Sequence, residues 1–166
     1  MRRIYKSVLS VLLVVLLFIY SVFLIIVGKR SCITRINKLE KDKSKLFSNY
    51  YISDYWVKIK QDGKNIGKYF EDNGIKRIVV YAYGSLGKTL CRELKNQNVE
   101  IVFVVDKDIS CDDQIEVKVG NVDEINGANV DMVVVTAPSA FENIKNSISD
   151  RVNCPIISIE DIIFSI

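Results

Sequence analysis

The sequence predicts an α/β protein in which a doubly wound parallel sheet follows a transmembrane helix and a helical stalk. Two observations predict this organisation. In the C-terminal half, short apolar segments alternate with amphipathic ones, which is typical of strands joined by right-handed helical crossovers. Near the N-terminus, an uncharged run of twenty residues is long enough for a helix to cross a bilayer. We therefore expect an anchor over residues 1–30, a stalk with a short packing helix over 31–74, and one domain over 75–166.

The anchor is the run over residues 8–27, which contains no charged side chain. As a helix it would measure about 30 Å, the thickness of the hydrocarbon core of a bilayer. A cleaved signal peptide has a shorter apolar region of roughly 7–15 residues, followed by small residues at the cleavage site. Here the run is followed by Gly28, Lys29 and Arg30. We expect a single-pass anchor in the cell (inner) membrane.

Basic residues on the two sides of this run predict its orientation. Three Lys and Arg precede it, whereas seven follow it: Lys29, Arg30, Arg35, Lys38, Lys41, Lys43 and Lys45. The side of a span that is richer in Lys and Arg stays in the cytoplasm. The C-terminal domain is therefore expected to be cytoplasmic. The four cysteines form no CxxC pair and are expected to be free thiols.

The stalk carries apolar residues at a rough three-four spacing, at Ile33, Ile36, Leu39, Leu46 and Tyr50, which predicts a helix that leaves the membrane. Lys43 falls where a seam residue of a coiled coil would lie. Two interpretations therefore stay open: a solvated stalk whose aromatic end packs on the domain, or a homodimer through the stalk. A second short helix is expected over residues 65–73, with Gly74 at its C-terminal cap.

The domain is expected to contain five strands, because five short apolar segments lack alternation and so resemble strands buried on both faces. They cover residues 77–82, 100–105, 115–119, 131–136 and 155–159. Helices are expected over residues 86–96, from Ser139 to about residue 149, and at the C-terminus. A strand order of 3-2-1-4-5 would place the ends of the first and fourth strands, and hence Gly84 and Thr136, side by side at the ligand crevice.

The turn after the first strand carries the glycine pattern A-x-G-x-x-G, which is typical of a Rossmann-like nucleotide site. Gly84 would let a phosphate approach the backbone, and Gly87 would let the helix pack closely on the sheet. The N-terminus of that helix would bind the phosphate. Asp106 ends the second strand, where its carboxylate could accept hydrogen bonds from ribose hydroxyls. The expected cofactor-binding residues are Ala82, Tyr83, Gly84, Ser85, Leu86, Gly87, Asp106 and Thr136. The expected ligand is a dinucleotide or a nucleotide sugar.

The same residues also satisfy a P-loop pattern, in which Lys88 would contact phosphates and Thr89 would bind magnesium. Mg-ATP is therefore an alternative ligand, but Gly84 has no role in that pattern. A third interpretation is that the glycines only make a tight crossover and bind nothing. These three alternatives stay open at the level of the sequence.

Composition limits the chemistry. The chain has no histidine, which excludes Ser-His and Cys-His dyads and histidine metal ligands. We identify no catalytic residue, no metal-ligating cluster and no YxxxK pair for hydride transfer. The net charge of +3 does not indicate nucleic-acid binding. A binding module without chemistry of its own is the expectation.

Several segments together carry a resemblance over about residues 50–166. These are the residues from Trp56 to Gly74, then IVVYAYGSLGKTLCREL, VVD, DMVVVTA and NCPIISIEDII. They resemble a Rossmann-like nucleotide-binding module of bacterial polysaccharide and nucleotide-sugar proteins, found alone or appended to glycosyltransferases and sugar-modifying methyltransferases. The N-terminal domain of sugar acyltransferases is similar. The resemblance implies that Gly84, Gly87 and Asp106 hold the nucleotide, although members of that family usually carry glycine at the position of Ala82.

The resemblance also implies a role in surface polysaccharide biosynthesis and a sugar-modifying enzyme or glycosyltransferase as partner. Three functions are consistent with the sequence. The first is a membrane-anchored nucleotide or nucleotide-sugar binding module. The second is a small NAD(P)-dependent reductase or epimerase-like enzyme that acts with a partner. The third is a membrane scaffold with a vestigial Rossmann fold.

Overall fold

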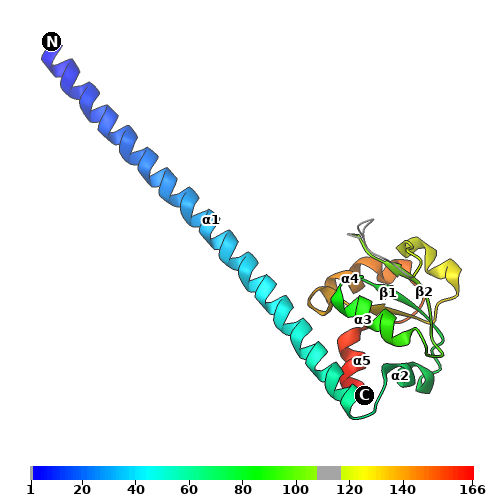
Figure 1. Ribbon diagram of the computed structural model, residues 1–166. Helices are drawn as coiled ribbons and strands as arrows, with labels where there is room; N and C mark the ends of the chain where they lie inside the picture. Colours follow the sequence, from blue (N-terminus) through cyan, green and yellow to red (C-terminus); the bar gives the residue numbers. More distant parts are fainter. Residues whose placement is uncertain (1, 108–116) are drawn as a thin grey trace. The chain divides into compact units, whose positions relative to one another are not determined.

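The computed structural model describes residues 2–107 and 117–166, and side chains from residue 15 on. The chain divides into two compact units, Met1–Ser44 and Lys45–Ile166. Helix α1 (Arg2–Gln61) provides all described residues of the first unit and the first residues of the second (Figure 1).

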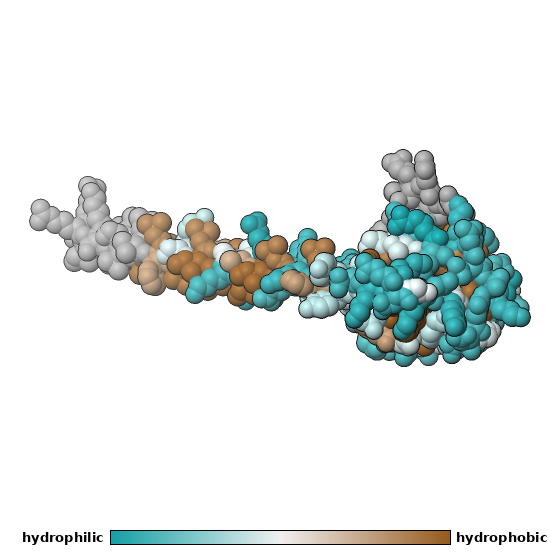
Figure 2. All heavy atoms as spheres, turned by 60° about the horizontal axis from the view of Figure 1, so that its bottom comes forward, coloured by the Kyte–Doolittle hydropathy of each residue, from teal (hydrophilic) through white to brown (hydrophobic). Residues whose placement is uncertain are grey.

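In the first unit, α1 is long and apolar enough to cross a membrane once. Its apolar side chains from Val15 on pack against nothing in the described part of the unit, and Phe18 is 69% exposed. Figure 2 shows these apolar residues in brown along the helix surface. A core helix of a soluble protein would bury one side of such a run, so the exposure fits a segment whose natural surroundings are apolar.

The second unit is built on a sheet of four parallel strands. These are β1 (Arg77–Tyr81), β2 (Glu100–Val105), β3 (Met132–Val135) and β4 (Ile156–Ser158), in the order β2-β1-β3-β4. Both faces of the sheet are buried: Ile78 and Val80 of β1 enter one core cluster, whereas Val79 and Tyr81 enter the other. This explains why the strands read as uninterrupted apolar runs.

Helices cover both faces, so the domain is a three-layer α/β structure. One core cluster includes residues of the end of α1 and of α2 (Ile66–Asp72), α3 (Ser85–Leu94) and α5 (Ile159–Ser165). The other includes Ile148 of α4 (Phe141–Ile148) and Ile125, which lies between two short 3-10 turns, Val122–Glu124 and Asn126–Ala128. Two further 3-10 turns, Pro138–Ala140 and Ser149–Arg151, flank α4.

The prediction of a strand over residues 115–119 is wrong for residues 117–119, the part of this range that the structure describes. Residues 115 and 116 lie outside the described residues, and Val119 forms only an isolated parallel bridge with Val104. Pairing does not continue, because Gly120 packs against the ring of Phe103 and Asn121 then caps the turn Val122–Glu124. The sheet therefore has four described strands, and the five-strand order 3-2-1-4-5 is not confirmed.

The end of α1 is part of the domain. Trp56 is 4% exposed and donates a hydrogen bond from Nε1 to Oε2 of Glu93 in α3, at 2.6 Å. Lys60 forms an ion pair with the same carboxylate, with Nζ 3.1 Å from Oε1. After α1, Asn65 caps α2 by accepting hydrogen bonds from the backbone N–H groups of Gly67 and Lys68. The expected short helix at residues 65–73 is thus present as α2.

Candidate functional site

The carboxyl ends of three strands meet at one edge of the sheet. β1 pairs with β2 on one side and with β3 on the other, so the residues that follow them, Ala82, Asp106 and Thr136, are neighbours. The backbone N–H of Thr136 donates to the carbonyl oxygen of Tyr81 at 2.9 Å, and the N–H of Ala82 donates to that of Val105 at 2.8 Å. This is the edge at which open α/β sheets bind their ligands.

The turn between β1 and α3 contains only three residues, Ala82, Tyr83 and Gly84. Ala82 has a φ of +76°, in the left-handed region that favours glycine. The backbone N–H of Tyr83 donates to Oδ2 of Asp106 at 2.5 Å. The hydroxyl of Thr136 donates to the carbonyl oxygen of Ala82 by a short hydrogen bond. Side chains from the ends of two other strands therefore hold the turn in place.

The fold requires glycine at residue 87 but not at residue 84. A Cβ on Gly87 would collide with the carbonyl oxygen of Ala82 and would lie 2.8 Å from Oγ1 of Thr136, so α3 can pack this closely only with glycine. Gly84 has an ordinary φ of −76°, and a Cβ on it would meet nothing within 4 Å. Neither backbone conformation nor packing in the described chain requires glycine at residue 84, which leaves the space beside the N-terminus of α3 open.

The start of α3 can offer backbone N–H groups to an anion. Gly84 is the N-cap residue and has no side chain with which to cap them. Ser85 is exposed, whereas Leu86 is buried and could contribute only its backbone. The partial positive charge of the helix N-terminus favours a negatively charged group at this place.

The geometry does not fit a P-loop. In a P-loop, the residues between the two glycines form a loop whose backbone N–H groups surround the phosphates. Here α3 already begins at Ser85, and the N–H of Lys88 donates to the carbonyl oxygen of Gly84 at 2.9 Å. Thr89 donates its hydroxyl to the carbonyl oxygen of Ser85 within the helix, and Nζ of Lys88 lies 5.5 Å from the centre of the Tyr83 ring.

The expected site residues thus fall into two groups. Gly84 and Ser85 are exposed and Tyr83 is half-buried, so a ligand could touch all three residues. Thr136 is 5% exposed and directs its hydroxyl to backbone carbonyls, so it supports the turn. Gly87 acts by packing, and Ala82 by its backbone conformation. Asp106 is half-buried and contacts the turn directly.

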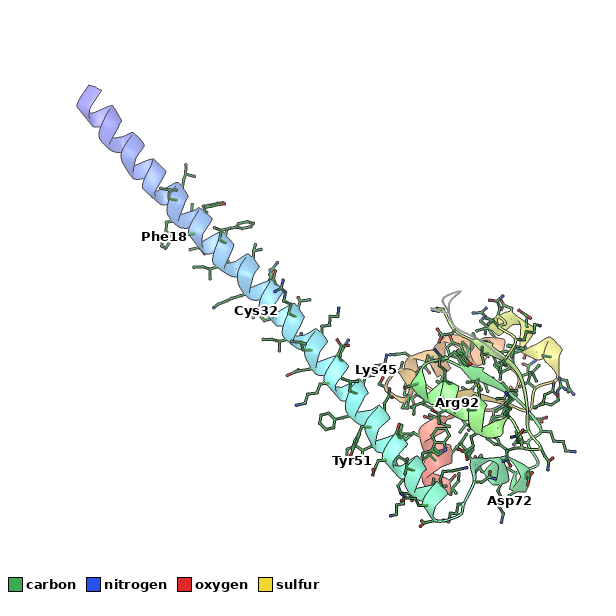
Figure 3. All side chains as sticks on the ribbon, viewed as in Figure 1. Phe18, Cys32, Lys45, Tyr51, Asp72 and Arg92 are labelled. Atoms are coloured by element: carbon green, nitrogen blue, oxygen red, sulfur yellow. The ribbon has the colours of Figure 1, made fainter. Side chains whose placement is uncertain are left out.

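One feature beside the turn is absent from the sequence-based expectations. A hollow of about 720 Å³ runs along α3 and the β2 edge; Tyr83 of the turn and Lys88 of α3 both line it. Arg92 and the C-cap residue Lys95 also line it, so α3 and its C-terminal cap present basic residues at spacings of four and three. Figure 3 labels Arg92 on α3. That spacing is visible in the sequence and could have revealed a basic surface next to the glycine turn.

The thiol of Cys91 also lines this hollow, and burial raises its pKa to about 11. The thiolate is the nucleophilic form of cysteine, and burial of Cys91 favours the protonated thiol near neutral pH. Among the described residues, no three His, Cys, Asp or Glu side chains are placed to hold a metal ion.

Comparison with curated proteins and with solved structures gives no match. A protein-family model described as C2185-like, N-terminal, matches residues 74–158. The matched range begins just before β1 and ends with β4, so it contains the whole sheet and the glycine turn. It covers more than half of the chain, and the protein therefore belongs to the C2185-like, N-terminal family.

Proposed function

We propose that the protein is a membrane-anchored module that binds a nucleotide or a nucleotide sugar through a Rossmann-like domain. The observation that carries this proposal is Gly84: it is exposed at the N-terminus of α3, and nothing in the described chain requires glycine there. In dinucleotide-binding turns, the glycine at this position lets a pyrophosphate approach the backbone. The open space at Gly84 is what such an approach needs.

The rest of the ligand would extend from the turn over neighbouring groups. Asp106 would accept hydrogen bonds from ribose hydroxyls while it holds the N–H of Tyr83. The basic side of α3, with Lys88 and Arg92, lines the adjoining hollow and would attract a second anionic group. A phosphate-containing ligand matches both the helix N-terminus and this basic surface.

The anchor and its basic flank support a cytoplasmic position for the domain. The apolar run of α1 precedes seven Lys and Arg between residues 29 and 45, against three before the run. Nucleotides and nucleotide sugars are cytoplasmic metabolites, so this orientation brings the domain to its proposed ligands. Together with the resemblance to polysaccharide and nucleotide-sugar proteins, it supports an accessory role in bacterial surface polysaccharide biosynthesis beside a sugar-modifying enzyme or glycosyltransferase.

A scaffold with a vestigial nucleotide site is the second candidate. It is favoured by Ala82, which has the strained left-handed conformation where a glycine is expected. In this alternative, the bonds from Asp106 and Thr136 to the turn are purely structural. Ligand binding separates the two candidates.

The test is ligand binding by the full chain in detergent micelles, with thermal shift and titration calorimetry for NAD, NADP, UDP-sugars and S-adenosylmethionine. Mg-ATP serves as the probe for the P-loop alternative. The decisive variant is Gly84→Val, which places side-chain atoms in the open space and whose Cβ meets nothing within 4 Å. Its matched control is Gly127→Val, because Gly127 is also an exposed glycine with ordinary φ and nothing within 4 Å of a Cβ.

We expect one of the nucleotides to stabilise the wild type and Gly127→Val equally, and Gly84→Val to lose that affinity while it melts at the wild-type temperature. If Gly84→Val still binds the nucleotide, its phosphate does not bind at the N-terminus of α3. A chain that binds none of the probes would favour the scaffold.

A further inference from the structure

Helix α1 exposes a row of apolar side chains beyond its membrane run. In the first unit, Ile36 is 48% and Leu39 68% exposed. In the second unit, Leu46, Tyr50 and Val57 are between 55% and 69% exposed. An apolar row of this length on a helix surrounded by water indicates a surface that a partner covers.

The row follows a heptad repeat, with successive steps of four and three residues. One set of positions, conventionally named a, contains Ile36, Lys43, Tyr50 and Val57, and the other set, named d, contains Cys32, Leu39, Leu46 and Ser53. Lys43 and Ser53 interrupt the apolar pattern, and Cys32 begins it. A repeat of 3.5 residues is the spacing that keeps one seam facing a second helix along a coiled coil.

The domain does not use this side of the helix. Within the second unit, α1 buries Ile52, Trp56 and Ile59, each at most 4% exposed, in the domain core. The residues Leu46, Tyr50 and Val57 lie about 130° around the helix axis from that buried face. α1 therefore has one face packed on its own domain and another that is left for a partner.

Charged residues are distributed as a helix pair requires. In the first unit, Lys38 and Lys41 lie opposite the seam positions, where they would face water. Arg35 and Glu40 flank the seam and lie five residues apart, which is the spacing at which flanking residues of two parallel helices form interchain ion pairs. In a pair of parallel helices, Arg35 of each copy would therefore form an ion pair with Glu40 of the other copy.

We propose that α1 pairs with α1 of a second copy of this chain in a parallel coiled coil over residues 32–57. The parallel orientation rests on the proposed anchoring, because two copies that span the membrane in the same direction can pair only in parallel. Lys43 at one a position weakens the pair and fixes its register. The dimer brings two domains together at the membrane and leaves both glycine turns outside the seam.

Cysteine cross-linking of the full chain tests this pairing in vesicles of phosphatidylethanolamine and phosphatidylglycerol at low protein density. Residues at d face their counterparts across a parallel seam, near the separation that a disulfide requires. Cys32 is exposed (Figure 3). Oxidation should give a disulfide-linked dimer in the wild type, and Cys32→Ser should abolish it.

Two further variants in the Cys32→Ser background provide the matched comparison. Leu39→Cys places a thiol at the seam, and Lys41→Cys places one on the outer side only two residues away. We expect cross-linking at residue 39 to exceed that at residue 41 several-fold. Equal yields at the two positions, or no cross-link at 32 and 39, would overturn the proposal. Carbonate extraction of the vesicles tests the anchoring itself, and nucleotide binding plays no part in either readout.

A second measurement addresses the seam without cysteine. Replacing Lys43 by Ile should lower the dimer dissociation constant in detergent micelles several-fold by sedimentation equilibrium, because an apolar residue completes the seam. The control Lys41→Ile adds the same side chain on the outer side and should leave the constant unchanged. The same dissociation constant in both variants would contradict a seam at residue 43.

Discussion

The carboxylate of Asp106, directly after β2, accepts a hydrogen bond from the backbone N–H of Tyr83 in the turn after β1, with N and Oδ2 2.5 Å apart. This bond joins the ends of two neighbouring strands and fixes the turn that precedes α3. The residue expected to recognise a ribose therefore also shapes the site that would bind the phosphate. A substitution at Asp106 acts on both.

Replacing Asp106 by Ala should lower the free energy of unfolding by about 1 kcal/mol, because the partly buried N–H of Tyr83 loses its charged acceptor. Asp106→Asn keeps an oxygen for the N–H of Tyr83 and should recover most of that loss. Fluorescence of Trp56, the single tryptophan and buried in the domain core, reports the unfolding in urea. If Ala and Asn variants unfold at the same urea concentration, the bond to Tyr83 contributes nothing to stability.

The sequence predicted the four described strands because strands that are buried on both faces have uninterrupted apolar sequences. Val79 and Val80 are neighbours on β1 and are both fully buried, one in each core cluster. Only a strand covered on both faces tolerates such a run, so the absence of alternation predicts a parallel sheet between helices. α2 was predictable for a similar local reason, because Asn65 caps it and Gly74 follows it with a φ of +69°.

The expected strand over residues 115–119 could not be judged from local pattern. Val117 and Val119 have the residue type of a strand, but strand formation depends on continuous pairing with β2, and among residues 117–119, which the structure describes, pairing is limited to the bridge with Val104. The role of Asp106 was also hidden, because a carboxylate that binds ribose and one that binds a backbone N–H have the same place in sequence. Tertiary contacts decide both questions.

Ala82→Gly should stabilise the domain. A φ of +76° costs an L-residue with a Cβ about 1–2 kcal/mol, which glycine avoids. Glycine also gains entropy in the unfolded chain, so a net increase of up to about 1 kcal/mol in the free energy of unfolding is expected. The urea midpoint should rise with an unchanged slope. Gly84→Ala is the control, since its φ of −76° gives glycine no such advantage, and it should not lose stability.

Gly87→Val should destabilise the domain, because any Cβ at residue 87 meets the carbonyl oxygen of Ala82 and the hydroxyl of Thr136. Both atoms belong to the hydrogen bonds that hold the turn, so α3 must move away from the sheet. Overpacking of this kind costs about 1–3 kcal/mol. The melting temperature of Gly87→Val should fall clearly below that of Gly84→Val. Equal melting temperatures would show that α3 does not rest on the turn at residue 87.

Asp131 should make the domain sensitive to acid. Its Oδ2 accepts hydrogen bonds from the backbone N–H groups of Lys76 and Arg77, both at 2.8 Å, and these bonds hold the pKa of the carboxyl below its ordinary value of 3.8. A carboxyl with a lowered folded-state pKa stabilises the fold fully above its unfolded pKa. That stabilisation disappears as the pH falls through the folded-state pKa.

The free energy of unfolding should therefore fall as the pH is lowered from about 5 to about 2. Glu124 adds to this in the same direction, because the backbone N–H of Asn121 lowers its pKa. The contribution of Asp131 is isolated by Asp131→Asn, which keeps the shape but cannot be protonated in this range. The variant should be less stable than the wild type at pH 6, and the difference should shrink as the pH falls. Urea unfolding at a series of pH values checks this, and two parallel pH curves would mean that the bonds from Lys76 and Arg77 do not distinguish the charged carboxyl from its neutral form.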